Sequence, residues 1–236
     1  MLEVSNLTAG YGAATVLQDV GISVDEGKFV VVTGPNGHGK TTLLRVLSGL
    51  LPADSGEISF RGERISGRSA ASIVARGLVH IPQGDLLFVD LTVEQNLYMG
   101  AYLRDAWRGR RERIRRVYEL FPRLEERRTQ QARTLSGGER RMLGIGRGLM
   151  SNARMLMVDE PALGLAPVLV QEVYATLDRI ARSEATVLLV EETLANAKDI
   201  ADYVYLMDTG RIVHQGTMAD FGEDVLHSTY LGSKGA

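Results

Sequence analysis

The stretch GPNGHGKTT (Gly34–Thr42) contains the residue types that can hold a phosphate group. It fits the pattern G-x-x-x-x-G-K-[ST], and it lies between a β-branched run, KFVVVTG, and a stretch with helical spacing, KTTLLRVLSGL. Glycines let backbone N–H groups wrap a phosphate at the positive end of the following helix. We expect Lys40 to reach the β- and γ-phosphates and the Thr41 hydroxyl to ligate Mg²⁺. The alternative is a glycine-rich turn without a ligand, and the flanking elements favour the phosphate loop.

A pair of carboxylates, Asp159 and Glu160, ends the apolar run ARMLMVDEP. Asp159 is suited to a water-mediated contact with Mg²⁺, and Glu160 to polarising the water that attacks a γ-phosphate. Adjacent acids at a strand end are common, so the phosphate loop upstream is what favours a catalytic interpretation.

The segment LSGGER (Leu135–Arg140) is a candidate for a second anion site. Ser136 can cap the next helix, while Gly137 and Gly138 leave its first amides accessible. The alternative is an ordinary helix start.

A second acid pair, Glu191 and Glu192, ends the run ATVLLVEE. For Glu191 the sequence favours a solvated or helix-capping acid.

The elements that must position these residues alternate along the chain. Apolar runs of strand length are Lys28–Gly34, Gly77–Gln83, Ala153–Pro161, Ala185–Glu192 and Asp202–Gly210. Helical stretches are Lys40–Leu50, Thr92–Leu103, Arg110–Leu120, Gly138–Met150, Pro167–Ala181 and Thr193–Ala201. This alternation predicts an α/β fold with a mainly parallel sheet, flanking helices, and ligands at the carboxyl ends of the strands.

Three regions depart from that alternation. The first ~30 residues, together with GEISFRGERI, predict a small N-terminal antiparallel β-subdomain. Residues 85–150 hold helices without a clear strand, which indicates an α-helical subdomain inserted into one domain spanning 1–236. The stretch MDTGRIVHQG predicts a late hairpin that turns at Asp208–Gly210.

Composition narrows the class of protein. The chain has 236 residues and is 44% hydrophobic, which suffices for one well-buried domain. No apolar run approaches the ~20 residues of a membrane span, and the N-terminus lacks the pattern of a secretory signal. Zero cysteines exclude disulfides and thiolate metal sites. The net charge of −2 argues against a general polyanion binder.

The charge is unevenly distributed. Between Leu103 and Arg147 there are fourteen arginines and six acids. A solvated helical face is the plainest interpretation. Docking near anionic lipid headgroups and nucleic-acid binding are the alternatives, and the second is the weaker because aromatic residues for stacking are few there.

A phosphate loop, then LSGGE, then MLMVDEP, in this order, resembles an ABC-type ATPase domain, and the resemblance covers essentially the whole chain. It implies a P-loop NTPase fold, binding of ATP and Mg²⁺, and ATP hydrolysis. It also implies a head-to-tail dimer, in which the LSGG segment of one subunit completes the nucleotide site of the other.

The resemblance assigns roles to particular residues. Tyr11 would stack on adenine, with a turn tyrosine as the alternative, and Gln83 would touch Mg²⁺ and the attacking water. Catalytic candidates are Glu160, Gln83 and Lys40, with Glu192 at a modified switch position. Nucleotide contacts in the same subunit would come from Tyr11, Gly34, Pro35, Asn36, Gly37, His38, Gly39, Lys40, Thr41 and Thr42. Contacts in trans would come from Ser136, Gly137, Gly138 and Glu139, and Mg²⁺ contacts from Thr41, Gln83 and Asp159.

The segments DEPALGLAPVLVQEVY and LSGGERRMLGIGRGLM, with the ending HSTYLG at 227–232, resemble the smaller ATPase of branched-chain amino acid importers. Most ABC ATPases have aspartate where this chain has Ala166, and that importer group has GLAP, as here. Urea and amide importers have closely similar ATPases. The resemblance implies separate permease subunits, a second ATPase subunit that is the same or different, and indirectly an extracytoplasmic solute-binding protein. It places the chain peripherally on the cytoplasmic face of the cell membrane, with no nucleic acid expected.

Two residues depart from the family pattern. His38 stands where a small residue is usual, and we expect its side chain to point to solvent without a catalytic role. Glu192 stands where most members have a histidine that contacts the γ-phosphate. Like charges near 4 Å repel by ~4 kcal/mol at an effective dielectric of 20. We therefore predict that Glu192 is protonated, turned away, or shielded by Mg²⁺ or Lys40, and that it is not the general base.

Other functions within this class are open to test. A DNA-repair ATPase would need room for long coiled coils between Thr42 and Leu135, and a translation factor would need two ATPase domains. A cofactor-assembly ATPase of this length is disfavoured only by the GLAP segment. A regulator that does not hydrolyse nucleotide ranks last, because Gln83, Asp159 and Glu160 are all present.

Overall fold

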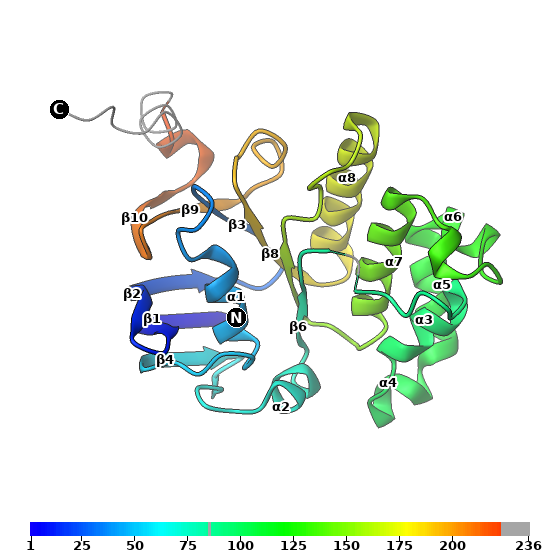
Figure 1. Cartoon of the computed structure of the whole chain (residues 1–236), viewed down its shortest axis with the longest axis horizontal. Helices are drawn as coiled ribbons and strands as arrows, with labels where there is room; N and C mark the ends of the chain where they lie inside the picture. The colour runs from blue at the N-terminus through cyan, green and yellow to red at the C-terminus, as the bar shows by residue number, and fades with distance from the viewer. Residues whose placement is uncertain (85, 223–236) are drawn as a thin grey trace.

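A computed structural model describes residues 1–84 and 86–222, which form two β-sheets with helices between and beside them (Figure 1). The larger sheet has six strands in the order β10-β9-β3-β8-β7-β6. Their bounds are β3 Phe29–Thr33, β6 Leu78–Ile81, β7 Met155–Asp159, β8 Thr186–Glu191, β9 Tyr203–Asp208 and β10 Arg211–Gly216.

Five of these strands run parallel, and β10 pairs antiparallel with β9 as the predicted hairpin. Every residue of β3 and β7 is buried, as continuous β-branched and aliphatic runs predict for strands covered on both faces. The register pairs Thr33 with Glu191 and Asp159 with Val190. The carboxyl ends of β3, β8 and β7 therefore meet at one edge of the sheet.

The smaller sheet is antiparallel, in the order β2-β1-β4-β5, which confirms the predicted N-terminal β-subdomain. Its strands are β1 Leu2–Tyr11, β2 Ala14–Val24, β4 Ser55–Phe60 and β5 Glu63–Arg64. Helix α1, Lys40–Leu47, contributes Leu43, Leu44 and Leu47 to a core shared by both sheets. The helix that follows the phosphate loop is thus held between two sheets.

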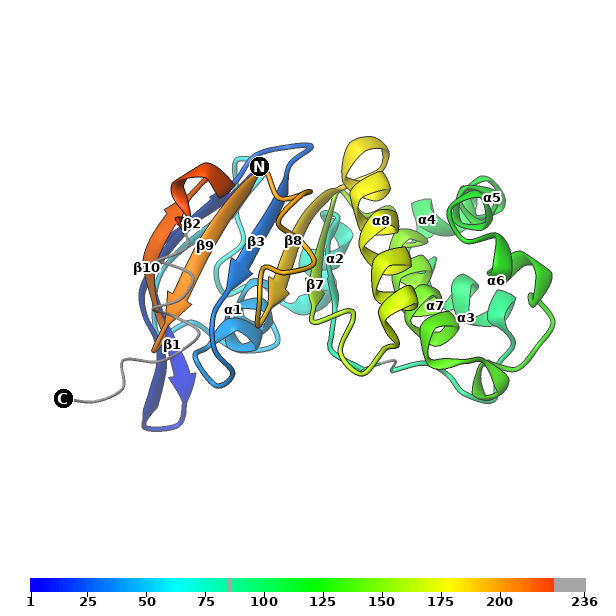
Figure 2. The ribbon, with the colours of Figure 1, turned by 90° about the horizontal axis from the view of Figure 1, so that it is seen from above.

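The second core cluster lies on the face of the larger sheet opposite to α1, where a separate group of helices lies to the right in Figure 2. These helices are α3 Val93–Gly100, α4 Arg104–Arg108, α5 Arg110–Leu120, α6 Pro122–Glu126, α7 Gly137–Leu149 and α8 Pro167–Ser183. Among the described residues between β6 and β7 the only β-pairing is an isolated bridge from Thr92 to Gln131. This agrees with the predicted helical insertion.

Two local predictions differ from the structure. Residues 193–201, predicted as a helix, form turns in which i→i−3 and i→i−4 hydrogen bonds alternate, as from Ala197 to Leu194 and from Lys198 to Leu194. The bonds do not propagate beyond one turn, so no helix is nucleated. Helix α2, Ala70–Ala75, was not predicted, although Ser69 caps it by accepting a bond from the Ser72 amide. In the described part of the chain, no helix is both long enough and apolar enough to cross a bilayer. The ending at 227–232 lies outside the described residues.

Candidate functional site

The phosphate loop joins the end of β3 to the start of α1 and packs directly against β9. A Cβ built on Gly34 would lie 2.0 Å from the Met207 carbonyl oxygen, so only glycine lets these two backbones approach. Gly37 and Gly39 have φ of 85° and 105°, in the left-handed region that glycine tolerates. The conformation of the loop therefore requires glycine at each of these three positions.

Lys40 is only 4% exposed and lies at the centre of the site. Its ammonium donates to the carbonyl oxygens of Gly34 (2.7 Å) and Pro35 (3.1 Å), and it lies 3.9 Å from Glu160 Oε1. Burial lowers the pKa of Lys40, while the nearby carboxylates, Glu160 first among them, raise it. One cation thus faces several acids in a confined space.

Asp159 is almost completely buried at the end of β7, and one of its oxygens is free. Its Oδ1 accepts a hydrogen bond from the Thr41 hydroxyl at 3.2 Å. Its Oδ2 is buried with no hydrogen-bond partner among the described residues. Burial raises the pKa of Asp159, and the bond from Thr41 and the charge of Lys40 lower it.

A buried carboxylate oxygen without a partner, next to a hydroxyl, suits a hard cation such as Mg²⁺. No group of three or more His, Cys, Asp or Glu among the described residues forms a metal cluster.

Glu160 adopts a backbone conformation that is rare for its residue type. Its φ is 43°, and its N–H donates to the Val190 carbonyl oxygen at 3.0 Å, which fixes the turn against β8. A left-handed non-glycine residue stores strain and is often found at functional sites. Its Oε2 accepts a hydrogen bond from Gln83 Nε2 at 2.8 Å, so the segment after β6 is tied to the acid after β7. Burial raises the pKa of Glu160, and Lys40 opposes the shift.

The structure does not place Glu191 as a solvated or helix-capping acid, which is what the sequence favoured. Its Oε1 accepts a hydrogen bond from the hydroxyl of Tyr174, a buried residue of α8. Burial raises the pKa of Glu191 to about 7. The sequence held no signal for this contact, because it needs α8 to lie across the end of β8.

Glu192 is exposed and contacts the phosphate loop. Its Oε2 accepts from Asn36 Nδ2 at 2.9 Å, and its backbone oxygen accepts from the Thr33 hydroxyl at 3.2 Å. This contact to the tip of the loop was not predicted. Glu160, in contrast, lies on the inner side of the site beside Lys40 and Gln83.

His38 does not point freely into solvent, so that expectation is wrong. Its Nδ1 lies 2.7 Å from Asp208 Oδ1 and 3.1 Å from the Thr209 amide nitrogen, and its side chain is 31% exposed. The Gly210 amide donates to the His38 carbonyl oxygen at 3.0 Å. His38 therefore fastens the phosphate loop to the hairpin between β9 and β10.

Tyr11 ends β1 with its side chain 44% exposed. Its hydroxyl accepts a hydrogen bond from Arg45 of α1 at 3.1 Å, which holds the phenol beside the helix that follows the phosphate loop. An exposed aromatic ring in this position can stack on a planar base.

The LSGG segment lies at the start of α7, on the other side of β7 and β8 from α1 (Figures 1 and 2). Ser136 caps α7 in a capping box with Glu139, whose buried carboxylate also pairs with Arg127 at 2.6 Å. Ser136 itself is exposed. One chain thus presents its phosphate loop and its LSGG segment at separate places.

A glycine-shaped loop between a buried parallel strand and a helix, beside strand-end acids and a buried lysine, defines a phosphate-binding α/β protein. The family description "ABC transporter" matches residues 17–163, and the chain belongs to this family. It is 40% identical to the high-affinity branched-chain amino acid transport ATP-binding protein BraG of Pseudomonas aeruginosa, over 98% of this chain and 100% of that one.

Two further relatives show the breadth of the similarity. The probable branched-chain amino acid transport ATP-binding protein LivF of Archaeoglobus fulgidus is 36% identical, with 92% of each chain covered. The lipopolysaccharide export system ATP-binding protein LptB of Escherichia coli is 30% identical, with 98% and 97% covered.

Solved structures agree with the fold. A nucleotide-free ATP-binding cassette from an ABC transporter superposes with a TM-score of 0.84 and 27% identity, covering 99% of this chain and 96% of that one. An ADP-bound cassette gives the same values. The chain is an ATPase subunit of the ABC transporter family, and the predicted family and fold class are confirmed.

Proposed function

We propose that this subunit hydrolyses MgATP to drive uptake of branched-chain amino acids through separate permease subunits. The observation that carries the choice of solute is similarity over the full length of BraG, at 40% identity. Similarity to LptB is lower, at 30%, and makes export the second candidate.

For the nucleotide, we assign Gly34–Thr42 to the phosphates and Tyr11 to the adenine. Backbone amides of the loop and the Lys40 ammonium carry the positive charge that polyphosphate needs. Support comes from the buried position of Lys40, which already lies among the loop carbonyls. Thr41 and Asp159 would hold Mg²⁺, which neutralises phosphate charge when it is bound.

For hydrolysis, we assign the general-base role to Glu160. Its strained backbone and its bond from Gln83 fix the carboxylate, and burial raises its pKa toward a value suited to accepting a proton. Gln83, which follows β6, would orient the attacking water together with Glu160, which follows β7. The LSGG segment would act on the site of a second ATPase subunit through Ser136, Gly137, Gly138 and Glu139. The carboxylate of Glu139 already accepts from the Ser136 amide and pairs with Arg127 in its own subunit.

For the permease, the structure offers a groove of about 500 Å³ beside the Gln83 segment. Leu86, Phe88, Met99 and Tyr102 line it, with side chains 66%, 47%, 47% and 58% exposed. An apolar groove rimmed by Arg147 suits insertion of an amphipathic helix. Seated there, a permease helix would contact the segment that is bonded to Glu160, and would place this subunit on the cytoplasmic face of the membrane.

Disruption of the gene in the native host tests the solute. Uptake of radiolabelled leucine, isoleucine and valine should fall, wild-type protein should restore it, and a Lys40→Ala variant of equal abundance should not. Co-purified partners identified by mass spectrometry should include permease subunits, a second ATPase if the dimer is mixed, and a solute-binding protein. Unchanged uptake, with export or cofactor-assembly proteins as partners, would refute the assignment while leaving the ATPase activity intact.

A further inference from the structure

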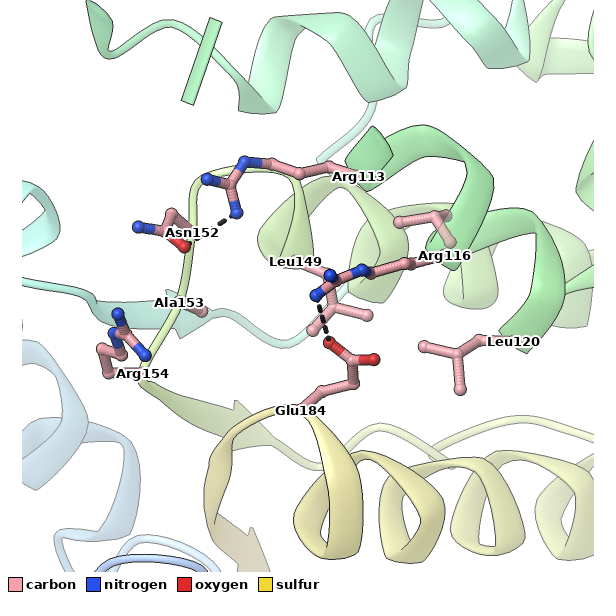
Figure 3. Close-up of a pocket in the computed structure, with 9 residues that line it drawn as sticks. Arg113, Arg116, Leu120, Leu149, Asn152, Ala153, Arg154 and Glu184 are labelled. Atoms are coloured by element: carbon pink, nitrogen blue, oxygen red, sulfur yellow. Dashed lines mark hydrogen bonds and ion pairs between the residues drawn. The ribbon is translucent and has the colours of Figure 1, made fainter. Parts of the chain in front are cut away.

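A cluster of arginines lies at the edge of the larger sheet opposite to the nucleotide site. Arg113 and Arg116 of α5 and Arg154, immediately before β7, line a cavity of about 100 Å³ together with Asn152 and Glu184 (Figure 3). Asp159 and Glu160 stand at the other end of β7, about 16 Å away at ~3.3 Å per residue. The cavity is therefore separate from the phosphate loop.

The backbone of Arg154 is fixed on both sides. Its N–H donates to the Gly77 carbonyl oxygen at 2.8 Å, and its own carbonyl oxygen accepts from the Thr186 amide at 3.0 Å. A Cβ on Gly77 would lie 2.8 Å from Arg154 Cγ, so the absence of a side chain there makes room for the arginine stem. No hydrogen bond or ion pair of the Arg154 guanidinium is found among the described residues.

Arg113 is oriented but incompletely satisfied. Its Nη1 donates to Asn152 Oδ1 at 2.7 Å, and Asn152 has a left-handed backbone with φ of 67°. Its Nε is buried with no partner among the described residues. Burial, with the neighbouring charges of Arg116 and Arg154, lowers the pKa of Arg113. A buried donor without a partner is costly, and an added acceptor removes that cost.

The nearby acids do not balance the arginines. Arg116 pairs with Glu112 at 2.6 Å and lies only 4.0 Å from Glu184. Two adjoining cavities of about 320 and 260 Å³ share Asn152 and Arg154 with the first. Together the three are lined by Arg61, Arg76, Arg104, Arg113, Arg116 and Arg154, against Asp105, Glu112 and Glu184.

The wall of the cavity includes the aliphatic side chains of Val117, Leu120, Leu149 and Ala153. Arginine forks match the oxygens of a phosphate group in paired hydrogen bonds, and aliphatic walls suit the organic part of the same molecule. We propose that this cavity binds the phosphate group of an organic phosphate, with Arg113 and Arg154 as its principal ligands. A free metabolite and a phospholipid headgroup both carry such a phosphate group, and the experiment distinguishes these two sources.

The test is titration of the full chain with sodium pyrophosphate by isothermal calorimetry, with saturating ADP present so that the phosphate loop is filled. A parallel arm measures co-sedimentation with phosphatidylcholine vesicles, with and without phosphatidylglycerol. The pocket variant is Arg113→Ala with Arg154→Ala. The matched control is Arg111→Ala with Arg115→Ala, which removes the same charge from exposed positions that line none of these cavities.

The pocket variant should bind at least about ten-fold more weakly than wild type, as loss of charge-assisted hydrogen bonds predicts, while the control stays within about two-fold. Pyrophosphate binding with this pattern supports a free phosphate, and vesicle binding alone with this pattern supports a headgroup. Glu184→Gln, which removes a competing carboxylate and preserves the side-chain volume, should bind more tightly than wild type. Equal binding by wild type and both double variants, or no binding to either probe, would overturn the proposal. Thermal unfolding of each variant confirms that it is folded.

Discussion

The two ends of β7 carry opposite imbalances of charge. At the carboxyl end, Lys40 faces Asp159, Glu160, Glu191 and Glu192. At the amino end, Arg113, Arg116 and Arg154 face Glu112 and Glu184. The acid end is tightly built into the core, whereas the arginine end opens to the surface. A net charge of −2 for the whole chain hides both local imbalances, because an excess of acids in one place and an excess of arginines in another cancel in the sum.

The largest expected effect is at the acid end. Glu160→Gln removes the proposed base while keeping the side-chain volume, so ATP turnover should fall by about 10²- to 10⁴-fold with nucleotide binding retained. Steady-state phosphate release and equilibrium binding of a fluorescent ATP analogue measure the two quantities.

The matched control is Glu192→Gln, at an exposed carboxylate immediately after the neighbouring strand β8. It should retain most of the turnover. An equal loss in both variants would mean that the two acids act as one unit and that the base is wrongly assigned.

The second prediction is that the acids at the carboxyl end of β7 make the free energy of unfolding depend on pH, whereas the arginines at the amino end do not. The Glu191 carboxyl has an ordinary pKa of 4.5 when unfolded and about 7 when folded, so the folded state holds more protons between these values. The free energy of unfolding should therefore fall as pH rises from 4.5 to 7, by up to about 3 kcal/mol from this group. Burial also raises the pKa values of Asp159 and Glu160, so these two groups contribute to the free energy of unfolding with the same sign. The arginines at the other end of β7 do not titrate between pH 4.5 and 7.

Urea denaturation at several pH values measures this slope for wild type and for Glu191→Gln. The variant should show a flatter profile over the same window. An identical slope would show that Glu191 is ionised in the folded protein and that its contact with Tyr174 has another basis.

The third prediction compares the glycine that supports each end. Gly34→Ala drives a methyl group to 2.0 Å from the Met207 carbonyl oxygen, which is backbone and cannot move aside. Gly77→Ala meets Arg154 Cγ at 2.8 Å and the Arg154 backbone nitrogen at 3.1 Å, so its contact with backbone is about 1 Å longer than the contact at Gly34. Overpacking costs about 1–3 kcal/mol, so Gly34→Ala should lower stability by more than Gly77→Ala.

Thermal and urea unfolding give the ranking. Gly37→Ala is the control for backbone strain without overpacking, because its φ is also positive, 85° against 153° at Gly34, and its new methyl would meet no neighbouring atom within 4 Å. If Gly34→Ala were no worse than Gly37→Ala, the close approach of β9 to the loop would not be rigid.

The smallest effect concerns the arginine end. Arg116 and Glu112 form an exposed i,i+4 pair with side chains 54% and 65% exposed, so Glu112→Gln should change stability by no more than about 0.5 kcal/mol. Urea denaturation measures it at low and high salt. A cost well above 1 kcal/mol would mean that these arginines serve the fold, which would weaken the argument for a ligand.

Features that depend only on residues close together in the sequence could be predicted from it. The phosphate loop, the strand ends and helices such as Arg110–Leu120 follow from local spacing, and their order suffices for the family. Residues 193–201 were misassigned because helical spacing alone does not decide whether a single turn is extended. The contact of Tyr174 with Glu191 joins a helix to a strand that lies beside it only in the folded sheet.

The arginine cavity shows the same limit more clearly. The excess of arginine between Leu103 and Arg147 is visible in the sequence, and its plainest interpretation is a solvated face. Arg154, Glu184 and Gly77 fall outside that segment. The pairing of β6 and β8 with β7 brings these three residues together, and the bond from Arg113 to Asn152 places α5 beside them. The charges along the sequence show that arginine is in excess, but they do not show which arginines lie together in the folded protein.

The strand order also has a consequence for synthesis of the protein on the ribosome. The two strands that pair with β3 are β8 and β9, which begin at Thr186 and Tyr203. The ribosome therefore synthesises β3 more than 150 residues before either partner strand. At ~5–20 residues per second the interval is roughly 8–30 s. During that time the phosphate loop has no strand beside it and no Met207 carbonyl to pack against. We expect the nascent chain to acquire affinity for nucleotide only after β8 and β9 have been translated, so that ATP binding would report assembly of the larger sheet around β3.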